Sequence, residues 1–222
     1  MIEDYIGLHK KRLETVVELL EACRAVSVLD LGCGEGRLIQ LLLRKPQFKQ
    51  IVGMDVSYKE LEAAADRLRL SRMPARQRQR VTLLQGSLLY RDGRMDGFDA
   101  AAIVEVIEHL DLPLLSTFER VVFEGARPKH IFITTPNREF NVKWKSMPGG
   151  KFRHPDHRFE WTRTEFQHWS RRAADRYGYE VRFLPVGPED PAIGAPSQIG
   201  VFTRNTDHLP GAEAPENMGG IR

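Results

Sequence analysis

Apolar and polar positions along the chain predict strands and helices in turn. Short, continuously apolar runs are typical of buried strands, whereas apolar positions three and four residues apart are typical of helices. Strands are predicted at 27–31, 50–55, 81–85, 98–104, 130–135, 180–186 and 198–203. Helices are predicted at 3–24, 37–44, from Ser57 onward, near 114–125 and at 163–177. This alternation favours βαβ units and a mainly parallel, seven-stranded α/β sheet with helices on both faces.

The two ends of the chain differ in character. In the first predicted helix an apolar face carries Leu13 and Leu20, and we expect Lys10, Lys11 and Arg12 on the opposite side. The last residues are rich in proline and glycine, which is typical of disorder. We therefore predict one domain over 1–204 and a disordered tail over 205–222.

Composition excludes several classes of protein. The 222 residues are 41% hydrophobic and 28% charged, which is ordinary for a globular chain, and no apolar run is long enough to span a bilayer. Cys23 and Cys33 form neither a CxxC pair nor a zinc-finger spacing, so a reduced, cytoplasmic setting is expected. The net charge of +3 is small, so any nucleic-acid binding must come from local clusters of charge.

A glycine-rich loop follows the first predicted strand. Gly32, Gly34 and Gly36 lie in Asp-Leu-Gly-Cys-Gly-Glu-Gly, where glycine permits a tight turn and a close approach of backbone N–H groups to a cofactor. A dinucleotide fingerprint would need glycine at Arg37, which argues against NAD. Asp55 ends the second strand, where a carboxylate can accept hydrogen bonds from ribose hydroxyls.

This combination resembles the class I S-adenosylmethionine-dependent methyltransferases. The resemblance implies that Asp30 faces the methionine end of the cofactor. It also implies that the segment Gln85-Gly86-Ser87-Leu88, after the third strand, lines the adenine, with Ser87 as a cofactor contact.

Acidic and histidine side chains follow the fourth predicted strand as Glu-Val-Ile-Glu-His. On a helical turn Glu105, Glu108 and His109 would share one face, so three metal-ligand types would converge. A divalent cation helps a hydroxyl to lose its proton, and two carboxylates with an imidazole suit Mn²⁺, Fe²⁺ or Co²⁺ better than closed tetrahedral zinc. The alternative is a surface turn with unpaired acids.

A basic and aromatic loop precedes the last predicted helix. Its two histidines, His154 and His157, follow the fifth strand and would return to the carboxyl edge of the sheet, where ligands gather in open α/β folds. Lys143, Lys145, Lys151, Arg153, Arg158 and Arg163 surround them, with Trp144, Phe152 and Trp161 available for stacking, although Trp161 also fits a core position. A second run of arginines at 67–80 is typical of a solvated helix face.

Three motifs together resemble one family. They are ExxEH after the fourth strand, Thr134-Thr135-Pro136-Asn137 after the fifth, and RHxDHRFEWTR in the loop. The chain resembles the RNA 3′-terminal 2′-O-methyltransferases named for the HUA enhancer of plants, in particular their bacterial RNA-repair branch, from about Leu8 to Phe202.

The resemblance implies a site and a substrate. The metal, Mn²⁺ with Mg²⁺ or Co²⁺ as substitutes, would be held by Glu105, Glu108, His109 and His157, between the protein and the 2′- and 3′-hydroxyls of the last nucleotide. The position of His154 varies in that family, so proton acceptance or a phosphate contact are roles left open for it. Separately, the local charge around the histidine loop predicts RNA contacts at Lys143, Lys145, Arg153 and Arg158, and Asn137 in the Thr-Thr-Pro-Asn turn is expected to touch the end nucleotide.

The resemblance also implies partners. These are RNA with free 2′- and 3′-hydroxyls rather than DNA or a membrane, and a polynucleotide kinase–phosphatase–ligase that reseals cleaved RNA. Three other functions stay open: a metal-dependent O-methyltransferase acting on catechol-like small molecules, a zinc peptidase, and a non-catalytic cofactor- or RNA-binding module. The peptidase would need histidine at Glu105 and leaves the glycine loop unexplained.

Overall fold

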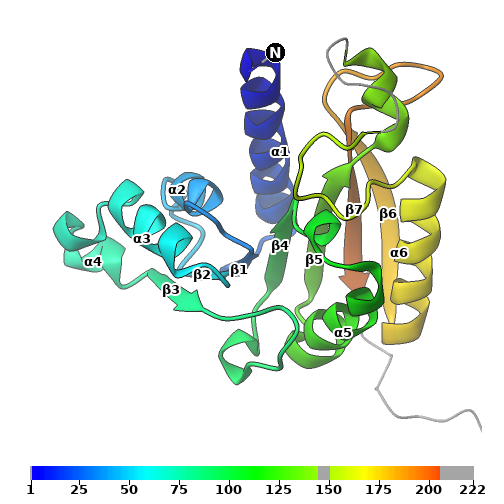
Figure 1. Cartoon of the computed structure of the whole chain (residues 1–222). Coiled ribbons are helices and arrows are strands. Elements are labelled where there is room, and N and C mark those ends of the chain that lie inside the picture. Colours follow the sequence, from blue (N-terminus) through cyan, green and yellow to red (C-terminus); the bar gives the residue numbers. More distant parts are fainter. Residues whose placement is uncertain (1, 145–150, 206–222) are drawn as a thin grey trace, which may run out of the picture.

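Seven strands form one sheet in the computed structural model, which describes residues 2–144 and 151–205. The sheet order is β3-β2-β1-β4-β5-β7-β6 (Figure 1). The strands are β1 (Ser27–Leu31), β2 (Gln50–Asp55), β3 (Val81–Gln85), β4 (Ala100–Val104), β5 (His130–Pro136), β6 (Tyr179–Val186) and β7 (Ser197–Arg204). The tail predicted for 205–222 lies, apart from Asn205, outside the described residues, and so does Lys145.

The predicted direction of the strands is confirmed. β1 to β5 pair in parallel, and β7 runs antiparallel to both β5 and β6. Six strands therefore point the same way. β1, β2 and β3 begin and end at the predicted residues, whereas β4 begins two residues later than predicted, at Ala100.

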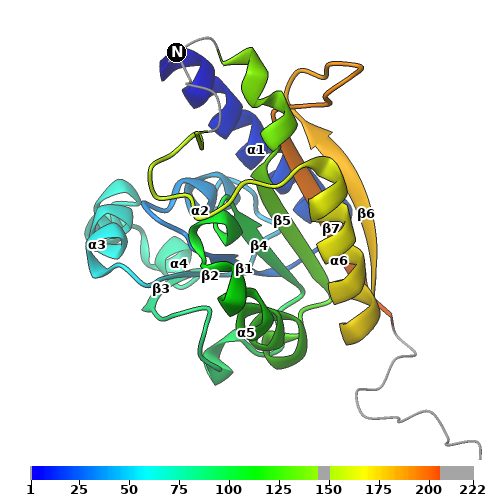
Figure 2. The same cartoon turned by 45° about the vertical axis from the view of Figure 1, so that its right-hand side comes forward.

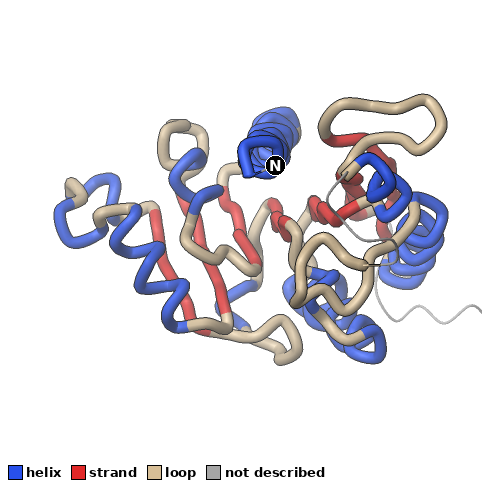
Figure 3. Tube along the Cα trace, turned by 45° about the horizontal axis from the view of Figure 1, so that its top comes forward, coloured by secondary structure: helices blue, strands red, loops and turns tan. Residues whose placement is uncertain are grey.

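Helices cover both faces of the sheet (Figure 2), and Figure 3 shows them outside the row of strands. One apolar cluster joins the sheet to α1, α2 and α3, and a second joins its other face to α5 and α6. These helices are α1 (Ile2–Ala22), α2 (Arg37–Leu42), α3 (Tyr58–Arg67), α5 (Leu115–Glu119) and α6 (Arg163–Tyr177). None of the described helices is long and apolar enough to cross a membrane.

Local caps explain why two helices begin where the sequence predicts. The Ser57 hydroxyl accepts the amide of Glu60 at the start of α3. At the start of α6, Thr162 and Glu165 form a reciprocal capping box, and Gly178 ends this helix in the left-handed conformation.

The segment predicted as one helix near 114–125 is more irregular. A 3₁₀ turn, η4 (Leu112–Leu114), leads into α5, and the chain then widens into a π-helical stretch, η5 (Arg120–Ala126). Gly125 lies in this stretch beneath Arg91, and an added Cβ there would come within 2.7 Å of the Arg91 side chain. The close packing of Arg91 accompanies the departure from regular α geometry.

Five further short elements are not apparent from periodicity because each is too short to repeat a pattern. They are η1 (Leu70–Arg72), α4 (Ala75–Arg78), η2 (Gly93–Met95), η3 (Ile107–His109) and η6 (Arg138–Lys143). Two of them, η3 and η6, lie just after β4 and β5 and carry residues of the candidate site.

Candidate active site

The predicted site residues meet at the carboxyl edge of the parallel strands. The glycine loop follows β1, Asp55 ends β2 and Glu105 follows β4. The other ends at this edge are those of β3, β5 and β6, together with the start of β7. Topology therefore brings a cofactor loop and a set of acids and histidines to one side of the sheet.

The glycine loop has the backbone that its sequence requires. Gly32 has φ +78°, and an added Cβ would lie 2.5 Å from the Val106 side chain. Gly34 has φ +47°, and a Cβ there would meet only a Glu60 oxygen at 4.0 Å. Gly32 is thus required by close packing, whereas Gly34 leaves an open approach to the loop.

Asp55 braces this loop. One carboxylate oxygen accepts the Gly34 amide at 2.9 Å, and the other accepts the Ser57 amide at 2.9 Å. Each oxygen keeps a further lone pair for a ligand. Ser87 lies half-buried beyond β3, where its hydroxyl accepts the Leu89 amide at 3.2 Å.

A cavity of about 170 Å³ opens beside the glycine loop, with Asp30 in its wall. The Asp30 side chain is buried, and its Oδ2 has no hydrogen-bond partner among the described residues. Burial, and then the nearby charge of Asp55, raise the pKa of Asp30 to about 7. A cationic group bound here would hold Asp30 ionised, which is consistent with the expected methionine end of the cofactor.

Two residues of this cavity were not predicted from the sequence. His9 lies on α1 and Arg37 begins α2, and both line the cavity. Burial, and then the charges of Arg12 and Arg37, lower the pKa of His9 to about 4. No spacing signal links residue 9 to a loop more than twenty positions away, so only the packing of α1 reveals its place.

Glu105 adopts an unusual backbone conformation at the end of β4. Its φ is +55°, a region that residues other than glycine rarely occupy, and its amide donates to the backbone and hydroxyl oxygens of Thr134. The carboxylate accepts the Thr134 hydroxyl at 3.0 Å and pairs with Arg12 at 2.9 Å. The predicted helical turn therefore covers only 107–109, and Glu105 is aimed by its own strained backbone.

The expectation that Arg12 lies away from the buried side of α1 is wrong. Its side chain is 1% exposed and reaches Glu105, while its Nε donates to the Ser197 hydroxyl at 2.7 Å. Lys10 and Lys11 are exposed as predicted. A guanidinium can be buried on an apolar helix face when acceptors such as these satisfy it.

Glu108 is the most deeply buried acid of the site. It is 0% exposed, and its Oε2 accepts the Thr135 hydroxyl at 3.2 Å, while Oε1 has no hydrogen-bond partner among the described residues. Burial, and then the charge of Glu105, raise the pKa of Glu108 well above its usual range. An unsatisfied buried oxygen of this kind calls for a cation or a proton.

Three histidines from η3 and the loop 151–161 form the group of possible metal ligands found among the described residues, and neither Glu105 nor Glu108 belongs to it. His109, His154 and His157 each bring a ring nitrogen within 4.8 Å of the other two. The loop is fastened here because the Arg158 amide donates to the Glu108 carbonyl at 2.7 Å. Desolvation, and then the neighbouring His157 and His154, lower the pKa of His109, which favours the neutral form of its ring. His154, whose role the sequence left open, thus belongs to the cluster.

Glu160 was not predicted as a site residue, yet it orients His157. Its Oε1 lies 2.6 Å from His157 Nδ1, and its Oε2 accepts the Asn141 amide at 2.6 Å. Burial would raise the pKa of Glu160, but hydrogen bonds from His157, Asn141 and the Arg153 amide lower it below its usual range. An ionised acid behind a histidine is the arrangement that fixes metal ligands in proteins, and its signal in the sequence is the i, i+3 spacing within the loop.

Two predicted RNA contacts are occupied within the protein. Asn137 is 0% exposed and donates to the carbonyls of Ile193 and Ala195. Arg153 donates to the carbonyls of Pro196 and Asn137 and to the Asn141 side chain. Both side chains therefore hold the loop against the edge of the sheet.

Of the remaining basic residues, some are exposed and paired with acids, and one has a structural role. Lys143 is exposed and pairs with Asp190 at 2.9 Å, and Arg158 is exposed and lies 3.7 Å from Asp111. In the 67–80 run, Arg80 donates to three backbone carbonyls, which is a structural role. Trp161 packs against the core beside Phe159, so it is not free for stacking with a base.

Comparisons with known proteins identify the family of this chain. A family model described as a methyltransferase domain matches residues 29–125. The chain is 39% identical over 209 residues to the small RNA 2′-O-methyltransferase of Mus musculus, covering 91% of this chain and 52% of the relative. The solved methyltransferase domain of a bacterial Hen1 is 50% identical, with a TM-score of 0.82 and coverage of 88% of this chain and 99% of that one. The chain belongs to the Hen1 family.

Membership of the Hen1 family confirms the resemblance and the class I methyltransferase fold predicted from the sequence. A chain from the structure of a Pnkp1/Rnl/Hen1 RNA repair complex shares the fold at 24% identity and a TM-score of 0.66, covering 89% of this chain and 41% of that one. This chain spans about half the length of the curated relatives that it matches.

Proposed function

We propose that this chain transfers a methyl group from S-adenosylmethionine to the 2′-hydroxyl of the 3′-terminal nucleotide of RNA. The observation that carries the proposal is that, in a chain of the Hen1 family, an open glycine loop and a cluster of histidines lie at the same edge of the sheet. Cofactor and acceptor would therefore meet at one edge of the sheet.

The residues proposed as ligands are of the types that bind a divalent cation, although the ligand atoms that already lie within 4.8 Å of one another belong to the three histidines alone. Glu108 offers a buried oxygen without a partner, and the ring nitrogens of His109 and His157 lie close together. With Glu105 these residues would hold the metal, and carboxylate and imidazole ligands together suit Mn²⁺. When bound, the cation would supply Lewis-acid chemistry that lowers the pKa of a nearby hydroxyl.

The cofactor side would bind S-adenosylmethionine through backbone and carboxylate groups. Gly34 leaves room for the cofactor against the loop, and Asp55 keeps lone pairs for ribose hydroxyls. Asp30 would accept the cationic methionine end, and Ser87 lies beyond β3 on the expected adenine side.

The reaction itself forms one bond and breaks another. The 2′-oxygen bonds to the methyl carbon while the bond from that carbon to sulfur breaks, and the hydroxyl proton leaves to a base. The three histidines and the carboxylates of Glu105 and Glu108 are the groups of this chain able to accept that proton. The reaction needs near in-line geometry, which the fixed edge of the sheet would provide.

An RNA-repair partner is part of the proposal. A structural neighbour is found in a complex with Pnkp1 and Rnl, and by analogy this chain would act beside a kinase–phosphatase–ligase that reseals cleaved RNA. Co-purification of the chain with such a protein, followed by methylation of cleaved RNA before it is sealed, tests this partner.

The activity is tested with labelled S-adenosylmethionine and three matched RNAs, with Mn²⁺ or with a chelator. One RNA ends in free 2′- and 3′-hydroxyls, one in a 2′-deoxy nucleotide and one in a 3′-phosphate. We expect transfer only to the first RNA, and only with metal. Transfer to none, with normal cofactor binding, would contradict the proposal and favour a catechol-like small molecule as the acceptor.

A further inference from the structure

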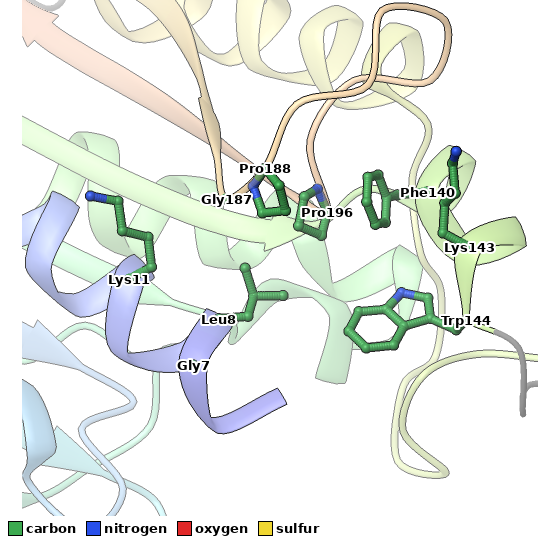
Figure 4. A pocket seen from close by; sticks show the side chains of 9 residues that line it. All are labelled: Gly7, Leu8, Lys11, Phe140, Lys143, Trp144, Gly187, Pro188 and Pro196. Carbon is green, nitrogen blue, oxygen red and sulfur yellow. The ribbon is translucent and has the colours of Figure 1, made fainter. Parts of the chain in front are cut away.

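A second, larger cavity lies at the same edge of the sheet but outside the site described above. It has a volume of about 620 Å³, and its walls come from α1, η6 and the segments that follow β6 and precede β7 (Figure 4). Phe140 and Trp144 form aromatic walls, Pro188 and Pro196 form flat aliphatic ones, and Leu8 lies between them. None of the residues assigned above to the metal or to the cofactor lines it.

The cavity is joined to the histidine cluster through Arg153. The guanidinium lies 5.6 Å from the centre of the Trp144 ring, and its Nη1 donates to the Pro196 carbonyl at 2.6 Å. The Arg153 amide donates at 2.6 Å to Glu160 Oε1, the same oxygen that faces His157. Arg153 therefore contacts two walls of the cavity, and through Glu160 it is linked to His157, a candidate metal ligand.

Positive charge stands at both ends of the cavity. Figure 4 shows Lys11 and Lys143 on opposite sides of it. Lys11 is exposed and makes no ion pair within the described part of the chain, while Lys143 is paired with Asp190 at 2.9 Å. A flat, apolar occupant attached to a negatively charged backbone complements these surroundings.

We infer that this cavity binds one unpaired nucleobase of the RNA, at a nucleotide other than the one that is methylated. The inference rests on the proposed function. Aromatic and proline walls suit a base, which has two flat faces, and Lys11 suits a phosphate beside it. Because the metal and cofactor residues do not line the cavity, its occupant would be a neighbour of the reacting nucleotide along the strand.

Single abasic substitutions in the RNA test this inference. Each of the second, third and fourth nucleotides from the 3′ end is replaced in turn, and kcat and KM are measured for methyl transfer. Wild-type protein should show a KM raised roughly tenfold to a hundredfold at one of these positions, with kcat nearly unchanged, because base–aromatic stacking is lost. The other positions should have small effects.

Two cavity variants and one control complete the test. In Trp144→Ala the penalty of the sensitive abasic position should disappear, because the stacking surface is already gone. Phe140→Ala should behave alike, and it keeps the contact between Arg153 and Trp144. Val142→Ala changes the same 3₁₀ helix at an 80% exposed side chain outside the cavity, and should retain the full penalty.

The outcomes separate this inference from the proposed function. Normal methylation of intact RNA with no sensitive abasic position would overturn the inference and leave the function standing. A penalty that persists unchanged in both cavity variants would also overturn it. The inference would also be overturned if Trp144→Ala left the abasic penalty unchanged but abolished docking of a partner protein. Absence of methylation of any RNA by wild-type protein would count against the proposed function itself.

Discussion

The two halves of the sheet edge build their sites in different ways. On the side of β1, β2 and β3, the loop after β1 presents backbone N–H groups, and one acid, Asp55, braces it. On the side of β4 and β5, side chains from η3 and the loop 151–161 lie at the edge, and two of them, Glu108 and His157, are each held by another side chain. The first half depends on local backbone geometry, whereas the second depends on contacts between distant segments.

This difference determines how each half should respond to substitution. Changes on the cofactor side should alter cofactor affinity, because few side chains there support anything else. Changes on the acceptor side should alter turnover or metal affinity while the cofactor still binds. Four predictions follow the comparison, beginning with the largest expected effect.

The largest effect is expected for the buried acid and histidine of the acceptor side. His157→Ala and Glu108→Gln should reduce methyl transfer to the background, because each removes a proposed metal ligand. Cofactor affinity, measured by calorimetry, should stay within about twofold of wild type, a difference well below the energy of one hydrogen bond. Glu180→Gln, at an exposed acid on β6, is the control. Loss of cofactor binding in either site variant would mean that these residues serve the cofactor side as well, and would contradict the division into two halves.

Asp30→Asn should weaken cofactor binding by about tenfold to a hundredfold, the usual cost of losing a hydrogen bond to a charged group. It should also change the pH dependence of stability. Burial raises the pKa of Asp30 in the folded chain to about 7, so between its ordinary pKa and about 7 the folded chain binds more protons than the unfolded chain. The wild-type chain therefore loses stability as the pH rises through this window.

The variant has a neutral side chain at every pH and should lack this loss. Melting temperatures of the cofactor-free proteins at pH 5.5 and pH 8.5 measure the effect. We expect the melting temperature of the variant, relative to that of wild type, to be higher at pH 8.5 than at pH 5.5. An equal difference between the two proteins at both pH values would mean that Asp30 is ionised in the folded chain throughout.

Glu160→Gln should have an intermediate effect, confined to the acceptor side. The carboxylate lies 2.6 Å from His157 Nδ1, and removing such a support for a metal ligand costs about tenfold to a hundredfold in metal affinity or activity. Titration with Mn²⁺ should show that more metal restores much of the lost rate. If added metal restores nothing, the role of Glu160 lies in the fold of the loop rather than in orienting His157.

The smallest effect is expected from exposed cations. Lys151→Ala combined with Arg158→Ala should weaken RNA binding and flatten its dependence on salt, by roughly 1.4 units of slope for two phosphate contacts on a single strand. Arg72→Ala combined with Arg76→Ala, at exposed positions on the cofactor side, is the matched control and should leave the slope unchanged. If both double variants gave the same salt slope, Lys151 and Arg158 would not be RNA contacts.

The sequence predicted the cofactor half more fully than the acceptor half. β1, β2 and β3 are short apolar runs, of which β2 ends in aspartate and the other two are followed directly by glycine, so periodicity and turn chemistry give their limits to the residue. Glu105 and Glu108 are predicted to lie together from their spacing, whereas His157 joins them only through the family resemblance. How Glu105 is aimed was missed, because a left-handed residue after a strand leaves no pattern.

The residues that escaped prediction share a physical cause. Arg12 looked solvent-facing because charge usually is, and its burial is understandable only once Glu105 and Ser197 lie beside α1. His9 lines the cofactor cavity for the same reason, since it lies on α1 too. Glu160 acts through His157 and Arg153, and such support appears only when the loop is folded.

The contact between Arg12 and Glu105 also matters for anyone who redesigns this protein. A helix that comes before the first strand supplies the guanidinium that meets an acid after the fourth, so the candidate site is spread over more than ninety positions of the chain. Shortened versions that begin after residue 12, or chimaeras that exchange the first helix, would leave Glu105 without this ion pair while the glycine loop stayed intact. A domain exchange that aims to change the acceptor should therefore carry α1 together with the loop 151–161.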